Sequence, residues 1–162
     1  MALNTLILSA LLCLLPVSEL RGGLPFALSR GLPPVIAFLF CISVNTLVSP
    51  LVFLFLSTLH RVLIPLKLYS RIFERLVERA RQKLRGKIEK YGYWGIAIFV
   101  GIPLPVTGAY TGTLGAWILG MHPKKSVLFI TMGVILSGMI VSIVYYLVTR
   151  LGVEALKIFI TE

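Results

Sequence analysis

The chain has 162 residues, of which 57% are apolar and only 14% are charged, against about 25% charged residues in an average globular protein. Together with a mean hydropathy of +0.95, this excludes an ordinary soluble domain and indicates an integral membrane protein. The net charge is +10, yet the sequence contains no Asp, which excludes chemistry that depends on an aspartate, such as a Ser-His-Asp triad.

Four apolar runs without charged side chains follow one another along the chain, at 1–18, 31–59, 91–121 and 126–149. A helix needs about 20 residues to cross the roughly 30 Å hydrocarbon layer, so the last three runs are long enough to span it. The first run lacks the basic start of a signal peptide, and we expect it to be retained. The predicted fold class is therefore all-α, a polytopic integral membrane protein with one membrane domain over 1–162.

The first run ends in a break at 16–25, which contains two prolines and a Gly-Gly pair. Proline removes an amide donor and glycine permits positive φ, so both interrupt a helix. Broken backbone at membrane depth is tolerated only where it is buried in protein or lines a cavity. We predict that the first half, 1–60, forms a hairpin with its tip at 16–25 and then a transmembrane helix over 33–59.

Positive charge is concentrated in the segment 61–90, which holds ten of the sixteen Lys and Arg residues and three glutamates. Apolar residues recur there at spacings of three and four, which predicts an amphipathic helix. We expect it to lie on anionic lipid at the cytoplasmic face, although a solvated helix that only fixes topology has the same pattern. Nucleic-acid binding is not expected, because no base-reading motif accompanies the charge. The residues expected to face lipid are Arg71, Arg75, Arg79, Lys83 and Lys87.

The second half, 91–150, repeats the order of the first, with a broken hairpin whose tip lies at 101–112 and a transmembrane helix over 124–149. A short tail is expected at 151–162. Interrupted segments at corresponding positions of two halves point to a transporter binding site. We favour two inverted halves, each with a re-entrant hairpin and one crossing, over a topology in which all four runs span. The distribution of basic residues does not decide between the two.

Glu19 and Arg21 are the strongest functional signal, because charged residues within apolar segments are rare and mark pathways, proton relays or counter-ions. A guanidinium can hold a phosphate or carboxylate in its planar fork, and the amides of Gly22 and Gly23 can approach an anion. A carboxylate in a low dielectric suits proton coupling. The alternative is that the two charges neutralise each other in an interfacial turn.

Polar residues elsewhere in the apolar runs form a second group of candidates. Asn45 can face the pathway or form an interhelical hydrogen bond, and Pro50 frees a carbonyl one turn earlier. In the second break, hydroxyls can contact substrate, whereas the glycines favour close helix packing. The candidates there are Pro103, Pro105, Thr107, Gly108, Tyr110 and Thr111.

Cys13 and Cys41 lie inside apolar runs without a CxxC motif or a nearby His, so we expect neither a disulfide nor a metal site, and interpret both as packing residues. No hydrolase, metalloprotease or Walker motif occurs. We therefore expect no enzymatic activity and no cofactor.

The sequence resembles the small multidrug export protein family over nearly the whole chain. The resemblance rests on 16–28 (PVSELRGGLPFAL), on Asn45 and Pro50, and on 102–112 (IPLPVTGAYTG). That family is similar, distantly, to the DedA superfamily, whose members carry paired re-entrant hairpins in inverted halves and include proton-dependent proteins implicated in moving polyprenyl-phosphate lipid carriers.

The DedA likeness implies that Glu19 and Arg21 are the membrane-embedded acid and arginine. The chain differs from DedA members in lacking arginines in its second hairpin, since 91–121 is uncharged.

We predict a multi-pass carrier of the cell membrane, homo-oligomeric because four short apolar segments make a thin wall around a polar site. Its substrate is expected to be an anionic amphiphile such as a polyprenyl phosphate, moved with proton coupling through Glu19. Export of cationic drugs is an alternative, in which Glu19 binds the substrate directly. A membrane organiser that transports nothing, and uses its basic helix to recruit lipid, is an alternative of another class.

Overall fold

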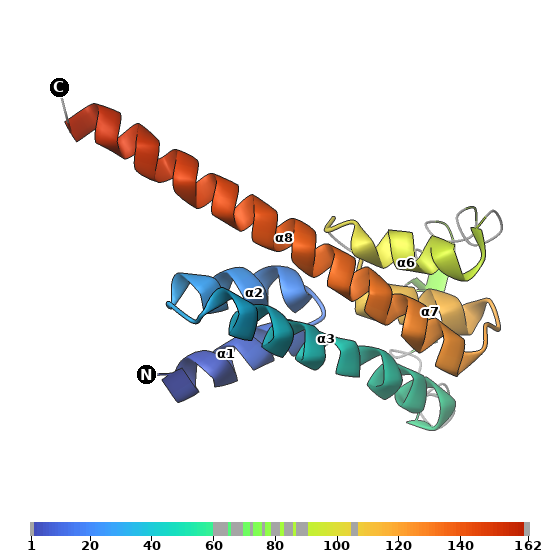
Figure 1. The fold of residues 1–162 in the computed structure, drawn as a ribbon. Coiled ribbons are helices and arrows are strands. Elements are labelled where there is room, and N and C mark those ends of the chain that lie inside the picture. Colours follow the sequence, from blue (N-terminus) through green and yellow to red (C-terminus); the bar gives the residue numbers. More distant parts are fainter. Residues whose placement is uncertain are drawn as a thin grey trace.

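The computed structural model describes residues 2–59, 91–104 and 107–160, and single positions between them at 65, 70, 71, 73–75, 77, 78, 82 and 86. All regular elements in these residues are helices, as the sequence predicts. In chain order they are α1 (Ala2–Leu14), α2 (Glu19–Ser29), α3 (Pro34–Ser57), α6 (Tyr93–Gly101), α7 (Ala109–Ile118) and α8 (Pro123–Ile160), shown in Figure 1.

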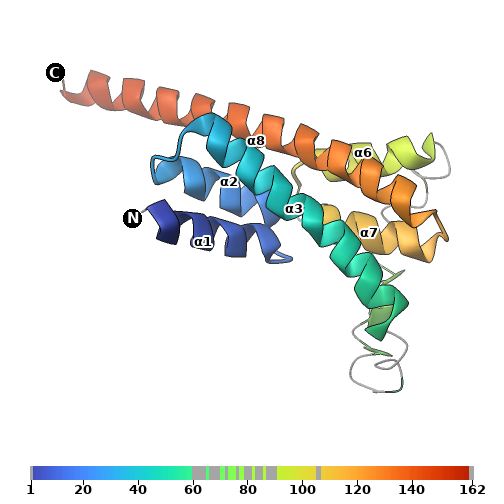
Figure 2. The same cartoon turned by 60° about the horizontal axis from the view of Figure 1, so that its bottom comes forward.

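Two long helices, α3 and α8, organise the bundle. They pass along each other, with α1 and α2 paired at one end of the molecule and α6 and α7 at the other (Figures 1 and 2). Both α3 and α8 contact α2 and α7. The two short pairs are therefore held by the same two long helices, and the loops within the pairs approach each other near the middle.

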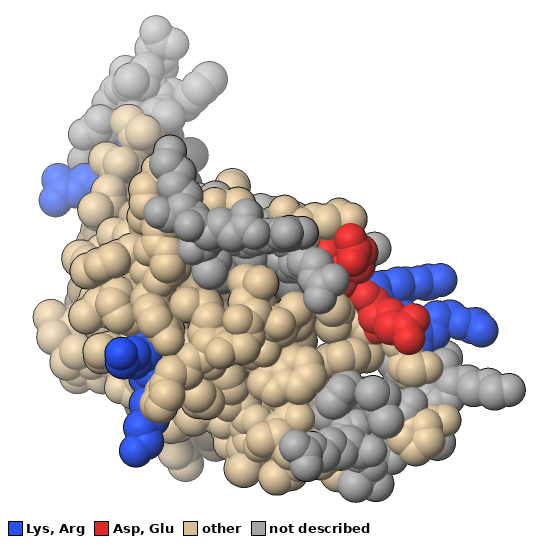
Figure 3. All heavy atoms as spheres, turned by 90° about the vertical axis from the view of Figure 1, so that its right-hand side faces the viewer, with Lys and Arg blue, Asp and Glu red and all other residues tan. Residues whose placement is uncertain are grey.

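The long helices have the length and composition of membrane spans. Pro34–Ser57 and Pro123–Gly152 are apolar enough to cross a bilayer, and only 33% and 28% of their most hydrophobic windows are buried inside the protein. Most of their apolar side chains thus face outward. Such an apolar surface is favourable against lipid and unfavourable in water. Figure 3 views the right-hand end of the molecule in Figure 1, where the Lys, Arg and Glu side chains of the described residues lie toward the margins.

The start of α3 follows from its sequence. Pro33 is extended, with φ −52° and ψ 134°, and Pro34 occupies the first helical position, where its missing amide would have no partner in any case. The helix ends at Ser57. The prediction of a transmembrane helix over 33–59 is therefore confirmed as a helix to within two residues at each end.

The breaks are shorter than the sequence predicts. The first covers only 15–18, because α2 begins at Glu19 and includes Pro25, so most of the expected tip at 16–25 is helical. The second covers 102–108 rather than 101–112. The four helices beside these breaks contain 13, 11, 9 and 10 residues, which at 1.5 Å per residue makes each about 20 Å long or less.

The expected tail at 151–162 is also corrected, because α8 continues to Ile160 without interruption. The sequence between Thr149 and Ile160 has no proline, and Gly152 alone costs only about 1 kcal/mol in a helix. The C-terminal end of α8 consequently reaches beyond the other helices in Figures 1 and 2.

The amphipathic helix predicted over 66–90 lies largely outside the described residues, including Arg79, Lys83 and Lys87. Arg71 and Arg75 are described, and both are exposed. The ring of Phe73 packs edge-on against Trp117 of α7, with the centroids 6.1 Å apart. This part of the basic segment is thereby attached to the second helix pair.

Candidate functional site

The two breaks meet in the middle of the bundle, and Glu19 lies at the point of contact. Glu19 is 7% exposed and has φ +46°, the one positive φ of a non-glycine residue in the described part of the chain. A left-handed backbone costs an L-residue roughly 1–2 kcal/mol and persists where the surroundings enforce it, often at functional sites. The backbone at the start of α2 is therefore strained to bring this carboxylate inward.

The Glu19 carboxylate accepts hydrogen bonds from the first amides of α7. The amide of Ala109 lies 3.1 Å from Oε2 and that of Tyr110 lies 3.3 Å from Oε1. Amides at a helix N-terminus have no partner within the helix and carry the positive end of its dipole, so an anion is the favoured partner. Glu19 thus caps a helix that begins 90 residues later in the chain.

Gly108 leaves the space in which the carboxylate sits. A Cβ at this position would lie 2.0 Å from Oε2 of Glu19 and 2.6 Å from its Cδ, closer than any real carbon contact. The backbone of Gly108 is extended, with φ 175°, so the need for glycine here is one of space and not of conformation. Gly108, one of the candidate residues of the second break, therefore forms the floor of the Glu19 site.

Arg21 bonds the other side of the second break. Its guanidinium donates to the carbonyl oxygen of Leu104 and, at 3.0 Å, to the hydroxyl of Thr107. The Thr107 Oγ1 lies 2.7 Å from the carbonyl oxygens of both Ile102 and Leu104, so one hydroxyl holds the turn after α6. Arg21 therefore binds the second break and Glu19 binds the start of α7, contrary to the alternative in which they only neutralise each other.

The end of α1 is closed by residues from other helices. The hydroxyl of Tyr110 donates to the carbonyl oxygen of Leu14 at 2.5 Å. The side-chain amide of Asn45 donates to the carbonyl oxygen of Cys13 at 2.9 Å. The last carbonyls of a helix lack partners, and lipid supplies none. Side chains next to each break thus satisfy backbone groups next to the other break. Asn45 makes an interhelical bond, one of the two roles expected for it.

A small internal void joins these residues. Its volume is about 10 Å³, near the lower limit for one water molecule, and its lining includes Glu19, Arg21, Asn45, Gly108 and Ser137. Residues from the start of α2, from the second break and from both long helices therefore border one polar space. Ser137, on α8, was missed from the sequence, because a serine in an apolar helix is also typical of helix packing.

The remaining predicted residues lie apart from this space. Gly22 and Gly23 are helical, and a Cβ on them would meet Ser18 at 2.7 Å and the Cys13 sulfur at 2.2 Å. The amide of Gly22 bonds the Ser18 carbonyl, so these glycines serve packing, and the expected anion contact through the Gly22 amide is not available.

Three further candidates complete the comparison with the sequence. Pro50 is exposed on α3, and Thr111 is half-buried in the first turn of α7. Pro105 lies outside the described residues. The structure also pairs Thr113 with Ser49, whose hydroxyls are 2.9 Å apart and fully buried. Hydroxyl pairs between helices leave no distinct pattern in a single sequence, which is why this bond was missed.

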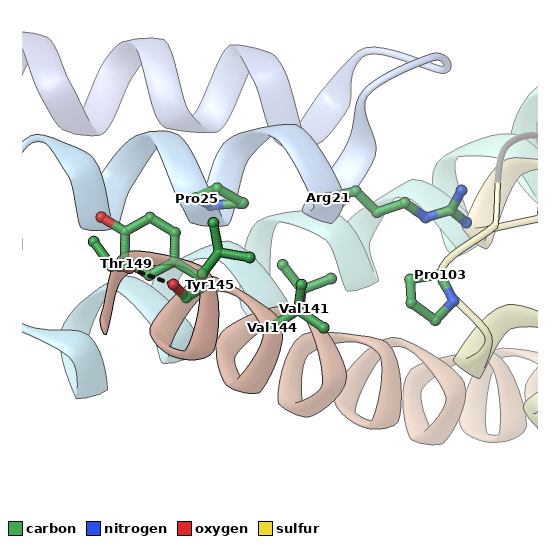
Figure 4. Close-up of a pocket in the computed structure, with 8 residues that line it drawn as sticks. Arg21, Pro25, Pro103, Val141, Val144, Tyr145 and Thr149 are labelled. Carbon is green, nitrogen blue, oxygen red and sulfur yellow. Dashed lines mark hydrogen bonds between the residues drawn. The ribbon is translucent and has the colours of Figure 1, made fainter. Parts of the chain in front are cut away.

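A groove of about 500 Å³ opens beside Arg21, between α2 and α8. Figure 4 shows the Arg21 side chain extending along it toward Pro103, with Val141, Val144 and Tyr145 of α8 facing α2. The volume lies in the range of small-molecule sites, and apart from Arg21 the lining contains no charged residue. The arrangement thus combines one cation with an apolar wall.

Comparison with known proteins identifies the family. Residues 19–140, more than half of the chain, match the family model described as "Putative small multi-drug export protein". No curated protein and no solved structure matches the chain. The matched region contains Glu19, Arg21 and the whole second break, and its apolar helices agree with a membrane protein. The chain belongs to the small multidrug export protein family.

Proposed function

We propose that this protein is a proton-coupled carrier that moves an anionic amphiphile, such as a polyprenyl-phosphate lipid carrier, across the cell membrane. The observation that supports it best is the contact between the start of α2 and the second break, where a buried acid holds the first amides of α7 and an arginine holds the backbone just before them. The family name supports a transport role and leaves the substrate open.

In this proposal the two short helix pairs are re-entrant hairpins. A helix of 13 residues is about 20 Å long and cannot cross a layer of roughly 30 Å, whereas two hairpins entering from opposite faces can meet inside it. The polar groups of the breaks, which pair with each other, fit such a position, because lipid offers them no hydrogen bonds. The basic segment 61–90 is placed at the cytoplasmic face, against anionic lipid.

Glu19 is the proposed coupling residue. Burial disfavours its charged form, whereas the hydrogen bonds from the two amides of α7 favour that form. Loss of these hydrogen bonds would therefore favour protonation of the carboxylate. Hydrogen bonds to a charged group contribute about 1.5–3 kcal/mol each. Protonation of Glu19 weakens both hydrogen bonds at once and releases the N-terminus of α7. The free energy lost with the two bonds is large enough to shift an equilibrium between two conformations of this contact.

Arg21 is the proposed substrate residue. Its hydrogen-bond partners are a carbonyl and a hydroxyl, both uncharged, and Glu19 is the nearby opposite charge. An anion can replace the two uncharged partners. An anion that takes the guanidinium loosens the 102–107 turn. Substrate and proton therefore act on the same break from its two sides, which is a physical basis for coupling.

Export of a cationic drug is less favoured by the geometry. A cation would have to reach Glu19, which is 7% exposed and already accepts two hydrogen bonds, while the accessible groove presents an arginine. The membrane-organiser alternative does not require a polar contact between broken helices. We propose neither enzymatic activity nor nucleic-acid binding, and we expect a homo-oligomer.

The test is transport in liposomes that contain the purified protein, a fluorescent polyprenyl-phosphate analogue and an imposed pH gradient. Glu19→Gln should abolish the dependence on the gradient, and Arg21→Ala should abolish movement. Arg30→Ala is the matched control, because Arg30 is an exposed cation at the end of the same helix, over the Phe26 ring. Movement that is unchanged in both site variants, or gradient-driven movement of a lipophilic cation in place of the phosphate, would contradict the proposal.

A further inference from the structure

We propose that the groove between α2 and α8 holds the hydrocarbon chain of the amphiphile while Arg21 holds its anionic group, so that the substrate enters sideways from the bilayer. The inference rests on the proposed function for the nature of the substrate. It adds the route by which the substrate arrives and the part of the protein that recognises its chain.

The wall of the groove on α8 is an apolar stripe. Val141, Val144 and Val148 are spaced by three and four residues, so they lie on one side of the helix. The groove extends at least from Val141 to Thr149, which is eight residues or about 12 Å. Such a stripe offers a hydrocarbon chain contact along its length, and the polar side chains that α8 adds to the lining are Tyr145 and Thr149.

The groove is open to the side of the bundle. Val144 is 51% exposed and Val148 is 66% exposed, although both line it. Because α8 is one of the helices that can span the membrane, the side chains that are exposed here face lipid. A chain already dissolved in the bilayer can therefore enter without crossing water.

Charge selects the occupant. In Figure 4 the Arg21 side chain lies at the end of the groove nearest Pro103, with the valines of α8 on the other side of the space. An apolar groove with one cation at its end matches a molecule with one anionic end and one hydrocarbon chain. A neutral lipid would offer the guanidinium no opposite charge in addition to that of nearby Glu19.

A second groove on the opposite side of α8 provides an internal comparison. It has a volume of about 380 Å³ and is lined by α2, α3 and α8 residues that include Val35, Phe38 and Ile143, with no charged residue. Ile143 is 59% exposed and directly precedes Val144, so neighbouring positions of one helix face different grooves. The charge near the first groove is thus the feature that distinguishes them.

The experiment uses the full-length protein in liposomes with two photoactivatable probes that carry the same diazirine in the chain, a polyprenyl phosphate and the uncharged polyprenol. We expect the phosphate probe to label 141–149, and the polyprenol to label exposed apolar faces without preference. Val144→Trp should reduce labelling by the phosphate probe about tenfold, as expected for a loss of about 1.4 kcal/mol, whereas Ile143→Trp should leave it unchanged. Arg21→Gln should remove the difference between the two probes.

Two results would overturn the inference. These are equal labelling in the two Trp variants, or labelling concentrated on the second groove. Comparison with the transport assay separates the two proposals. Transport that depends on Glu19 and Arg21 but not on Val144 rejects the groove alone, whereas groove labelling without gradient-driven transport rejects the proposed function alone.

Discussion

The contact between Gly108 and Glu19 gives the sharpest test of the site. Replacing Gly108 by Ala adds a methyl group 2.0 Å from a carboxylate oxygen, and ordinary contact begins at 3.4 Å. The carboxylate must therefore retreat by about 1.4 Å, the difference between these two distances. Its bonds to the amides of Ala109 and Tyr110, now 3.1 and 3.3 Å, would then be lost.

The expected loss follows from those two bonds. Hydrogen bonds to a charged group contribute about 1.5–3 kcal/mol each, so Gly108→Ala should lower the free energy of unfolding by about 3–6 kcal/mol. Gly152→Ala is the control, because nothing lies within 4 Å of its added methyl group. In a helix this change should be neutral or stabilise by up to about 1 kcal/mol.

A double-mutant cycle identifies the cause. In a Glu19→Ala background the methyl group has no carboxylate to displace, so Gly108→Ala should lose most of its effect, with a coupling free energy of at least about 2 kcal/mol. The assay is unfolding of the purified protein in mixed micelles with increasing SDS, followed by circular dichroism. The reasoning is refuted if Gly108→Ala costs the same in both backgrounds, or if it costs no more than Gly152→Ala.

The other contacts of the breaks give two further predictions. Tyr110→Phe removes the bond to the Leu14 carbonyl and should destabilise by about 0.5–1.5 kcal/mol in the same assay; a wild-type midpoint would show that this bond contributes nothing. Gly23→Ala places a methyl group 2.2 Å from the Cys13 sulfur and 2.8 Å from the Ser9 carbonyl oxygen, so we expect it to destabilise strongly. Cys13→Ala should rescue it only in part, since the Ser9 carbonyl belongs to the backbone and stays in place; complete rescue would contradict this geometry.

The sequence predicts the long helices well and the breaks less well. Pro33 and Pro34 mark the start of α3, and an uninterrupted apolar run defines its length. The first break was expected to be longer because Gly22, Gly23 and Pro25 all weaken a helix in isolation. In the folded chain, the two glycines allow α2 to approach Ser18 and Cys13, and the packing outweighs their low propensity.

The site shows a similar division. Glu19 and Arg21 stand out in the sequence because charge is costly in an apolar segment. Their partners do not, since those are the amides of residues 109 and 110 and the carbonyl of residue 104, and every residue has such groups. Side chains that bind backbone across 80 to 100 residues leave no local pattern, so only the fold reveals them.

The bond from Glu19 to the start of α7 also has a consequence for how the chain is made. The amide that bonds the Glu19 carboxylate is made 90 residues later, and the hydroxyl that bonds the Leu14 carbonyl is made 96 residues later. At about 5–20 residues per second, synthesis of that stretch takes roughly 5–20 s. During this interval the Glu19 carboxylate and the Leu14 carbonyl lack these partners, so the first helix pair reaches its final polar pairing only after the second pair has been made.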